Sequence, residues 1–266
     1  MSFDNQVILI TGASSGIGRC LAIDFAKLGA VVIGCGRSKE RLDGTFNQIR
    51  SSGRTATMLP CDVGNREHAE SMMAKVLEQF GRVDILINNA GIGMRQPFAE
   101  TPIETIEEIM RTNYLGMVYC THAVLPSMIR RRSGHVVNIS SIAGNIGFAN
   151  VAGYCGSKFA MNGFSESLYH EVKPHGVHVS VICPGPVRTE FNRAFADNPP
   201  KSPAFLMVEP EFISRVVLRA IEAKKFEIVT PRSLALVSWA KQLAPGLFRA
   251  VLHRASRSLA RQKKVK

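Results

Sequence analysis

A tyrosine and a lysine four positions apart, Tyr154 and Lys158, form the pair of residues best suited to chemistry in this chain. They lie in a stretch with helical spacing, where side chains at i and i+4 share one face. A free tyrosine has a pKa of about 10, which is too high for proton exchange at neutral pH. A fixed lysine ammonium would stabilise the phenolate and lower that pKa. The pair therefore predicts a general acid/base for interconverting a carbonyl and an alcohol, although an ordinary surface helix pair has the same spacing.

A glycine-rich turn follows the first predicted strand and opens the first predicted helix. Glycines permit a tight turn and close backbone approach, and the helix N-terminus supplies unpaired N–H groups and a positive dipole for a pyrophosphate. A plain strand-to-helix corner is the alternative, but the position after the first strand favours dinucleotide binding. The residues predicted to contact the cofactor in this turn are Gly12, Ser14, Ser15, Gly16, Ile17 and Gly18.

The end of the second predicted strand indicates which dinucleotide is bound. An enzyme that uses NAD(H) generally has an acidic residue there, which binds the ribose 2′-hydroxyl. This chain has Arg37 instead, with Arg41 nearby. An arginine can neutralise a 2′-phosphate through bidentate, charge-assisted hydrogen bonds. We therefore favour NADP(H) over NAD(H), with a solvated helix start as the alternative role of both arginines.

Further motifs follow the later predicted strands in a fixed order. Asn88-Asn89-Ala90-Gly91 follows the fourth strand, Asn113 lies in the next helical stretch, and Ser140-Ser141 ends the fifth strand. The sixth strand is followed by Pro184-Gly185-Pro186-Val187-Arg188-Thr189. Each motif is weak alone, but the joint set is specific. Together with the G-x-x-x-G-x-G turn, it resembles the classical short-chain dehydrogenase/reductase family over about residues 5–230.

The resemblance implies a role for individual residues. Tyr154 matches the family's proton donor or acceptor, and Lys158 matches the residue that lowers the tyrosine pKa and binds the nicotinamide ribose. Ser141 matches the serine that hydrogen-bonds the substrate oxygen, and Asn113 the asparagine that holds a water in the proton relay. Taken alone, Ser141 would be a strand-end hydroxyl, Asn113 a satisfied core amide and Asp62 a helix cap. The family's other cofactor contacts match Asp62, Val63, Asn89, Ala90, Gly91, Pro184, Gly185, Val187 and Thr189.

Apolar side chains near these motifs favour a lipophilic substrate, such as a steroid, a long-chain 3-keto compound or a retinoid. We expect Phe148, Phe191 and Phe195 to contact it, together with Ser141 and Tyr154. The phenylalanines could instead serve only packing, and a small polar carbonyl is an alternative substrate. An alternative of a different class is a non-catalytic protein that binds NADP(H) as a sensor or scaffold.

Short apolar runs alternate with helical stretches along most of the chain. The runs are continuous, which is typical of strands buried on both faces of a parallel sheet. The alternation predicts an α/β fold, a Rossmann-type doubly wound parallel sheet of about seven strands with helices on both faces. The predicted strands are Gln6–Ile10, Val31–Cys35, Thr55–Leu59, Val83–Ile87, His135–Ile139, Val177–Ile182 and Glu227–Val229. The predicted helices are Ile17–Leu28, Glu67–Phe80, Met110–Arg131, Gly153–Val172 and Phe212–Ala223.

We predict two parts in the chain. Residues 1–232 form a single catalytic domain, in which the proline-rich segment 184–210 is a substrate lid, with a passive surface excursion as the alternative. Residues 233–266 form a basic, amphipathic, helical C-terminal extension. Two apolar helical segments compose it, and Pro245-Gly246 separates them.

The formal net charge of +12 resides mainly in this extension. Residues 232–266 hold nine Lys or Arg and no Asp or Glu, whereas the rest of the chain is nearly balanced. An apolar helix face flanked by cations suits a helix lying in the interface of an anionic membrane. Packing on the body or on a partner subunit is the alternative. Nucleic-acid binding is not expected, because the extension has few aromatic residues and no recognition motif.

The cysteines, the histidines and the lengths of the apolar runs limit which kinds of site and which locations we expect. The six cysteines and seven histidines are scattered, so we expect no metal site and a reducing compartment. No apolar run approaches the roughly 20 residues of a spanning helix, and residues 1–6 lack the regions of a signal peptide. We therefore expect a cytoplasmic protein that the extension can bring to a membrane surface. By the resemblance, it acts on a small-molecule carbonyl or alcohol as a homodimer or homotetramer.

Overall fold

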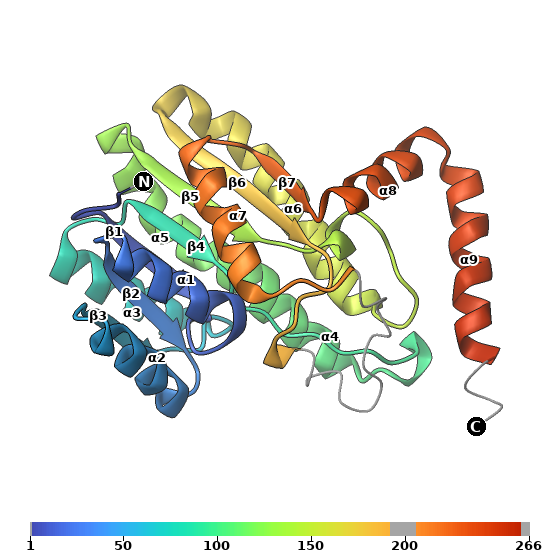
Figure 1. Ribbon diagram of the computed structural model, residues 1–266, viewed down its shortest axis with the longest axis horizontal. Helices are drawn as coiled ribbons and strands as arrows, with labels where there is room; N and C mark the ends of the chain where they lie inside the picture. Colours follow the sequence, from blue (N-terminus) through green and yellow to red (C-terminus); the bar gives the residue numbers. More distant parts are fainter. Residues whose placement is uncertain (1, 192–205, 262–266) are drawn as a thin grey trace.

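The computed structural model describes residues 2–191 and 206–261. Seven strands form one parallel sheet in the order β3-β2-β1-β4-β5-β6-β7 (Figure 1). This confirms the predicted doubly wound α/β class. The order reverses between β1 and β4, where such sheets bind ligands at the carboxyl ends of their strands. The strands are β1 (Val7–Thr11), β2 (Val31–Gly36), β3 (Ala56–Pro60), β4 (Ile85–Asn88), β5 (Gly134–Ile139), β6 (Val177–Pro184) and β7 (Glu227–Thr230).

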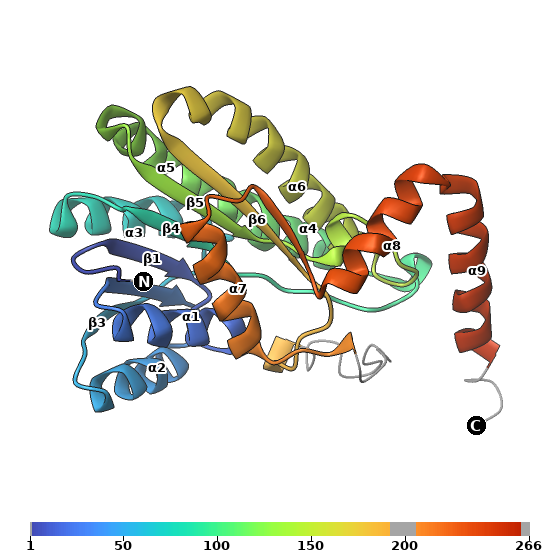
Figure 2. The ribbon, with the colours of Figure 1, turned by 45° about the horizontal axis from the view of Figure 1, so that its top comes forward.

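Helices cover both faces of the sheet because both faces are apolar. One face packs against α1 (Gly16–Lys27), α2 (Lys39–Ser51) and α7 (Pro210–Glu222). The other packs against α3 (Arg66–Phe80), α5 (Gly116–Arg131) and α6 (Ala152–Val172). Figures 1 and 2 show these layers, with α4 (Ile103–Met110) near one end of the sheet.

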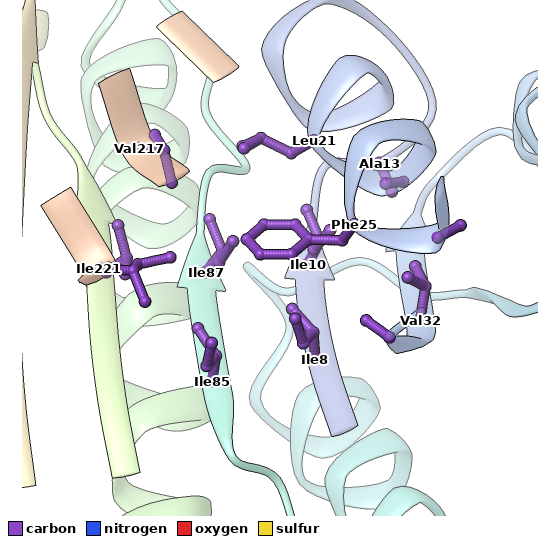
Figure 3. Packing of buried hydrophobic residues seen from close by; sticks show 14 of the residues in the cluster. Ile8, Ile10, Ala13, Leu21, Phe25, Val32, Ile85, Ile87, Val217 and Ile221 are labelled. Carbon is purple, nitrogen blue, oxygen red and sulfur yellow. The ribbon is translucent and has the colours of Figure 1, made fainter. Parts of the chain in front are cut away.

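The packing of α1 against β1 and β4 fixes the start of the glycine turn. Figure 3 shows Phe25 of α1 beside Ile10 of β1 and Ile87 of β4, and all three side chains are fully buried. Burying a side chain of this size stabilises a fold by about 1.5–3 kcal/mol. The first strand and first helix are therefore held firmly on either side of the turn that joins them.

Two helical stretches differ from the prediction. Helix α2 was not predicted, because it buries only Leu42, Thr45 and Ile49, and its apolar pattern is too sparse to show. The predicted helix Met110–Arg131 spans the last residue of α4, a π-helical turn at Arg111–Leu115 and α5, so the rest of α4 was not predicted. Such wide turns often occur at functional sites.

The two ends of the predicted lid are joined at its base. The N–H of Arg188 donates to the carbonyl of Val208 at 2.9 Å, and the N–H of Val208 donates to the carbonyl of Pro186 at 3.0 Å. Arg188 also pairs with Glu209 at 2.9 Å. Residues 192–205 lie outside the described residues, and Phe195 is among them.

Two helices follow the last strand. Helix α8 (Arg232–Leu243) starts at the end of β7, and α9 (Pro245–Arg261) turns back from it. In Figures 1 and 2, α9 stands apart from the sheet and its covering helices, and α8 connects the two. Within the described part of the chain, no helix combines the length and apolarity needed to cross a membrane.

Candidate active site

The motifs predicted to do chemistry meet at one edge of the sheet. The glycine turn follows β1, Asn89-Ala90-Gly91 follows β4, Ser141 follows β5, and Pro184-Gly185 ends β6. All of these strands are parallel, so their carboxyl ends lie at the same edge. The site therefore lies at the point where the strand order reverses.

Ser141, Tyr154 and Lys158 come together from two elements. Tyr154 and Lys158 lie one turn apart on α6, and Nζ of Lys158 is 5.8 Å from the centroid of the Tyr154 ring. Ser141 hydrogen-bonds to the Tyr154 side chain. Ser141 Oγ also accepts from the N–H of Ala143 at 3.1 Å, which fixes the serine at the start of a short 3-10 turn. The arrangement can place a hydroxyl pair against one substrate oxygen.

The electrostatics of this pair differ from the sequence argument. Burial raises the pKa of Tyr154 to about 12, and the hydrogen bond with Ser141 opposes that rise. Lys158 is only 4% exposed and donates to the carbonyl of Ile139 at 2.8 Å. Burial lowers the pKa of Lys158 to about 8. Burial is the main cause of both shifts, so the pKa of Tyr154 lies above its ordinary value rather than below it, and Tyr154 keeps its proton at neutral pH.

Asn113 is fully buried in the π-helical turn. Its Oδ1 accepts from the N–H of Ile92 at 2.8 Å, and its Nδ2 donates to the carbonyl of Ile92 at 2.9 Å. The same Nδ2 donates to Ser157 Oγ at 2.9 Å. Asn113 therefore ties the loop after β4 to the helix that carries Tyr154.

The glycine turn leaves no room for a side chain at Gly12 or Gly18. A Cβ on Gly18 would lie 2.2 Å from the carbonyl oxygen of Gly12 and 2.5 Å from Nδ2 of Asn89, while Gly12 has a φ of 68°. Thr11 Oγ1 accepts from the N–H groups of Asn89 and Ala90, at 3.0 Å each. Helix α1 begins without a side-chain cap, so its first N–H groups suit an anion such as a dinucleotide diphosphate.

A carboxylate lies at this helix end in the structure. The Glu190 carboxylate accepts from its own backbone N–H, pairs with Arg19 at 2.9 Å and accepts from the N–H of Gly16. These contacts lower its pKa, and the bond from its own N–H has the largest effect. Thr189 lies close by, because a Cβ on Gly16 would be 3.0 Å from its Cγ2. Glu190 was not predicted as a site residue. Its only signal in the sequence was a charge next to the predicted contact Thr189.

Of the predicted adenosine-side residues, Arg37 and Arg41 are surface groups with weak partners, whereas Asp62 and Val63 belong to a turn. Arg37 follows β2 and lies 3.4 Å from Glu108, with both side chains just over half exposed, at 54% and 52%. Arg41 lies in the first turn of α2, where its N–H donates to the hydroxyl of Ser38 at 3.3 Å. Asp62 Oδ1 accepts from the N–H of Gly64 at 3.0 Å and so fixes its own turn. Val63 is buried beside it.

On the expected substrate side, the structure brings one phenylalanine to the tyrosine. The ring of Phe191 is 5.8 Å from that of Tyr154, centroid to centroid. Phe148 is partly exposed, and its N–H contacts Sγ of Cys155 at 3.5 Å, next to the tyrosine. In residues 2–191 and 206–254, no group of His, Cys, Asp and Glu side chains is placed to hold a metal ion.

Comparisons with known proteins identify relatives along most of the chain. The family model described as short chain dehydrogenase matches residues 6–200. Dehydrogenase/reductase SDR family member 7B of Danio rerio is 41% identical over 197 residues, which cover 72% of this chain and 64% of that protein. Epidermal retinol dehydrogenase 2 of Mus musculus is 35% identical over 245 residues, which cover 90% of this chain and 78% of that protein.

Two solved structures have a closely similar fold. A short-chain dehydrogenase/reductase from Burkholderia phymatum, in complex with NAD, has a TM-score of 0.84 and 25% identity, covering 93% of this chain and 96% of its own. A metagenomic short-chain oxidoreductase, in complex with NADP, has a TM-score of 0.75 and 32% identity, covering 86% and 98%. The family match, the relatives and the fold agree: this chain belongs to the short-chain dehydrogenase/reductase family of oxidoreductases.

Proposed function

We propose that this protein is an NADP(H)-dependent oxidoreductase that interconverts a carbonyl and a secondary alcohol, with Tyr154 as general acid/base. The observation that carries the proposal is the meeting of Ser141, Tyr154 and Lys158 beside the glycine turn, at one edge of the sheet. When bound, the nicotinamide supplies or accepts the hydride. The side chains of this protein orient the substrate and move the proton.

In the direction of reduction, the tyrosine donates the proton. Ser141 donates a hydrogen bond to the carbonyl oxygen, and the hydroxyl of Tyr154 transfers its proton to that same oxygen as the alcohol forms. The raised pKa of Tyr154 keeps this proton in place until the substrate arrives. The ammonium of Lys158, near the ring, stabilises the phenolate that remains. Asn113 is proposed to hold the water through which the tyrosine is reprotonated.

The preference for NADP(H) rests on the charge at the end of β2. Arg37 and Arg41 are exposed there, and no acidic residue follows the strand directly. Among the described residues, Arg37 pairs with Glu108 at 3.4 Å on an exposed surface, so a 2′-phosphate can replace this partner. The contacts predicted at Asp62, Val63, Asn89, Ala90, Gly91, Pro184, Gly185, Val187 and Thr189 are proposed to bind the rest of the dinucleotide.

A lipophilic substrate is supported by the apolar groups beside the tyrosine. Phe191 faces its ring, Phe148 is partly exposed nearby, and one relative is named a retinol dehydrogenase. A small polar carbonyl would gain little from these rings. Oxidation of NADPH should be measured with a panel of steroid ketones, long-chain 3-keto compounds, retinal and small polar carbonyls. Turnover of only the polar members would contradict the lipophilic class, and NADPH binding without any turnover would favour the sensor or scaffold.

We also propose that α8 and α9 bind an anionic membrane surface. Their exposed apolar side chains are Leu236, Trp239, Leu243, Leu247 and Val251, and Leu243 is 85% exposed. The cations Arg232, Arg249 and Arg254 are exposed on the same two helices. An apolar face with a tryptophan and flanking cations suits insertion at the level of lipid headgroups. A lipophilic substrate would then be taken up where it is dissolved.

Vesicle pelleting tests this surface. Wild type should pellet with phosphatidylcholine vesicles containing phosphatidylserine and less with pure phosphatidylcholine. The double variant Leu247→Ser and Val251→Ser should remain in the supernatant, and an equal pelleting of both proteins would contradict the proposal.

By family resemblance, we further propose that the protein is a cytoplasmic homodimer or homotetramer. Light scattering after size exclusion would measure its mass.

A further inference from the structure

We propose that Lys241 of α8 is a positioning residue for the active site, because it holds the turn that carries Ser141. The inference rests on the proposed function, in which Ser141 orients the substrate oxygen. It concerns the inner face of α8, whereas the proposed membrane contact uses the outer face. The two faces follow from helical spacing. Leu234, Ser238 and Lys241 lie toward the body, while Leu236, Trp239 and Leu243 are exposed.

The inner face of α8 makes specific contacts with the catalytic body. Nζ of Lys241 donates to the carbonyl oxygen of Asn145 and lies 4.9 Å from the centroid of the Phe159 ring on α6. Ser238 is 5% exposed. Leu234 lies so close to the turn after β6 that a Cβ on Gly185 would be 2.4 Å from its Cδ1. Helix α8 is thus packed against two loops of the site.

Asn145 ends the turn that Ser141 begins. The short 3-10 turn Ile142–Gly144 has Ser141 as its N-cap and Asn145 as its C-cap. The N–H of Gly144 donates to the carbonyl of Ser141 at 2.8 Å, so the turn is closed on the serine. A contact that fixes the Asn145 backbone therefore lies only four residues from Ser141, whose hydroxyl contacts Tyr154.

The side chain of Asn145 is held from two other elements. Its Oδ1 accepts from Nδ2 of Asn162 on α6 at 2.6 Å, and its Nδ2 donates to Oε1 of Glu227 on β7 at 2.9 Å. Oδ1 of Asn162 in turn accepts from Ser140 Oγ at 2.6 Å. The turn is packed tightly, because a Cβ on Gly144 would be 2.9 Å from the carbonyl oxygen of Lys158. Lys241 adds a third contact to Asn145, because its Nζ donates to the backbone carbonyl oxygen of that residue.

Removing the lysine should loosen Ser141 without unfolding the turn. Asn162 and Glu227 still hold the Asn145 side chain, so the displacement is partial. A misplacement of about 1 Å far from the reacting atoms can cost about a hundredfold in rate. For this partial displacement we expect Lys241→Met to lower kcat roughly tenfold. The affinity for NADPH should be unchanged, because the described contacts of Lys241 are with the Ser141 turn and α6, not with the glycine turn.

The experiment compares Lys241→Met, Lys241→Arg and the control Gln242→Met. Gln242 is the exposed neighbour on the same helix. An arginine can still donate to the carbonyl and lie over Phe159. We expect kcat to fall in Lys241→Met, to recover in Lys241→Arg and to stay at the wild-type value in Gln242→Met. The dissociation constant of NADPH should be the same in all four proteins.

A second measurement does not depend on turnover. Hydrogen exchange of the segment 139–146 should be faster in Lys241→Met than in wild type and Gln242→Met. Full kcat and unchanged exchange in Lys241→Met would overturn the inference. So would a loss of kcat accompanied by an equal loss of NADPH binding, since that would show general damage. If wild type reduces no carbonyl, the proposed function fails, and the exchange rates still decide the role of Lys241.

Discussion

Substitution of Arg37 by serine tests how the protein chooses between the two dinucleotides. In the structure, the guanidinium of Arg37 lies 3.4 Å from the carboxylate of Glu108, and both side chains are just over half exposed. Such an exposed pair contributes at most about 1 kcal/mol. A 2′-phosphate offers the arginine stronger, charge-assisted hydrogen bonds, which contribute about 1.5–3 kcal/mol.

The difference between these two free energies determines how strongly the protein should prefer NADPH over NADH. If the phosphate replaces Glu108 and the full ~1 kcal/mol of that pair is lost, the net gain is roughly 0.5–2 kcal/mol, which corresponds to roughly 2–30-fold tighter binding of NADPH than of NADH. Arg37→Ser should reduce this ratio to about one, since the phosphate loses its cation. Glu108→Gln should tighten NADPH binding by up to about fivefold, because the competing carboxylate is gone.

Fluorescence titration of NADPH and NADH gives these dissociation constants. Arg111→Ser is a matched control, because Arg111 also pairs at 3.4 Å with an exposed glutamate, Glu107. The control should leave the ratio unchanged. Added salt should weaken NADPH binding more than NADH binding in wild type. Tighter binding of NADH by wild type, or an unchanged ratio in Arg37→Ser, would refute the assignment of Arg37.

Three other predictions concern the turn, the helix end and the core. Gly18→Ala should weaken NADPH binding more than tenfold or prevent folding, because its Cβ would lie 2.2 Å from the carbonyl oxygen of Gly12. The control Gly44→Ala lies in α2, where a Cβ meets nothing within 4 Å, and it should raise the melting temperature. Glu190→Gln should tighten NADPH binding in titrations, because the diphosphate no longer competes with a carboxylate at the N–H of Gly16; weaker binding would show that Glu190 supports the site. Burial, then His178 and Lys224, lower the pKa of His135 to about 3, so the folded state binds fewer protons than the unfolded state between that value and the ordinary pKa of about 6.5. Stability should therefore fall by up to about 2 kcal/mol from pH 7 to pH 5 through this group, and urea midpoints of His135→Gln should show less loss than those of wild type.

The elements whose signal is local could be predicted from the sequence. All seven strands were predicted because each is a short apolar run. The runs are buried in β1, β2, β4, β5 and β6, and they are partly exposed in the edge strands β3 and β7. The glycine turn was predicted because the spacing of its glycines determines its backbone conformation directly. Helix α2 was missed, because it buries only Leu42, Thr45 and Ile49, and these residues are too few to give a visible apolar stripe in the sequence.

Features that depend on three-dimensional packing could not be predicted. The shift of the Tyr154 pKa has the opposite direction to the prediction, because the sequence shows the charge of Lys158 but not the burial of both groups. The π-helical turn at Asn113 has no sequence signature of its own. The contact of Lys241 with Asn145 joins residues 96 positions apart, so only the folded chain reveals it.

The C-terminal extension shows why the two sequence alternatives for it were hard to separate. Packing on the body and contact with a membrane are alternatives in the sequence, and in the structure α8 has one face packed on the body and one exposed face. Its inner face contacts the catalytic body through Leu234 and Lys241. Its outer face, with Trp239 and Leu243, is exposed. An apolar stripe in a sequence indicates that a surface is covered, but not by what.

The role of Tyr154 is tested by one kinetic comparison. Tyr154→Phe removes the phenolic hydroxyl and keeps the ring beside Phe191. With NADPH and the best ketone of the panel, kcat should fall at least about a hundredfold, the contribution expected of a general acid. The dissociation constant of NADPH should not change. A variant that keeps the wild-type kcat would contradict the assignment of Tyr154 and, with it, the proposed mechanism.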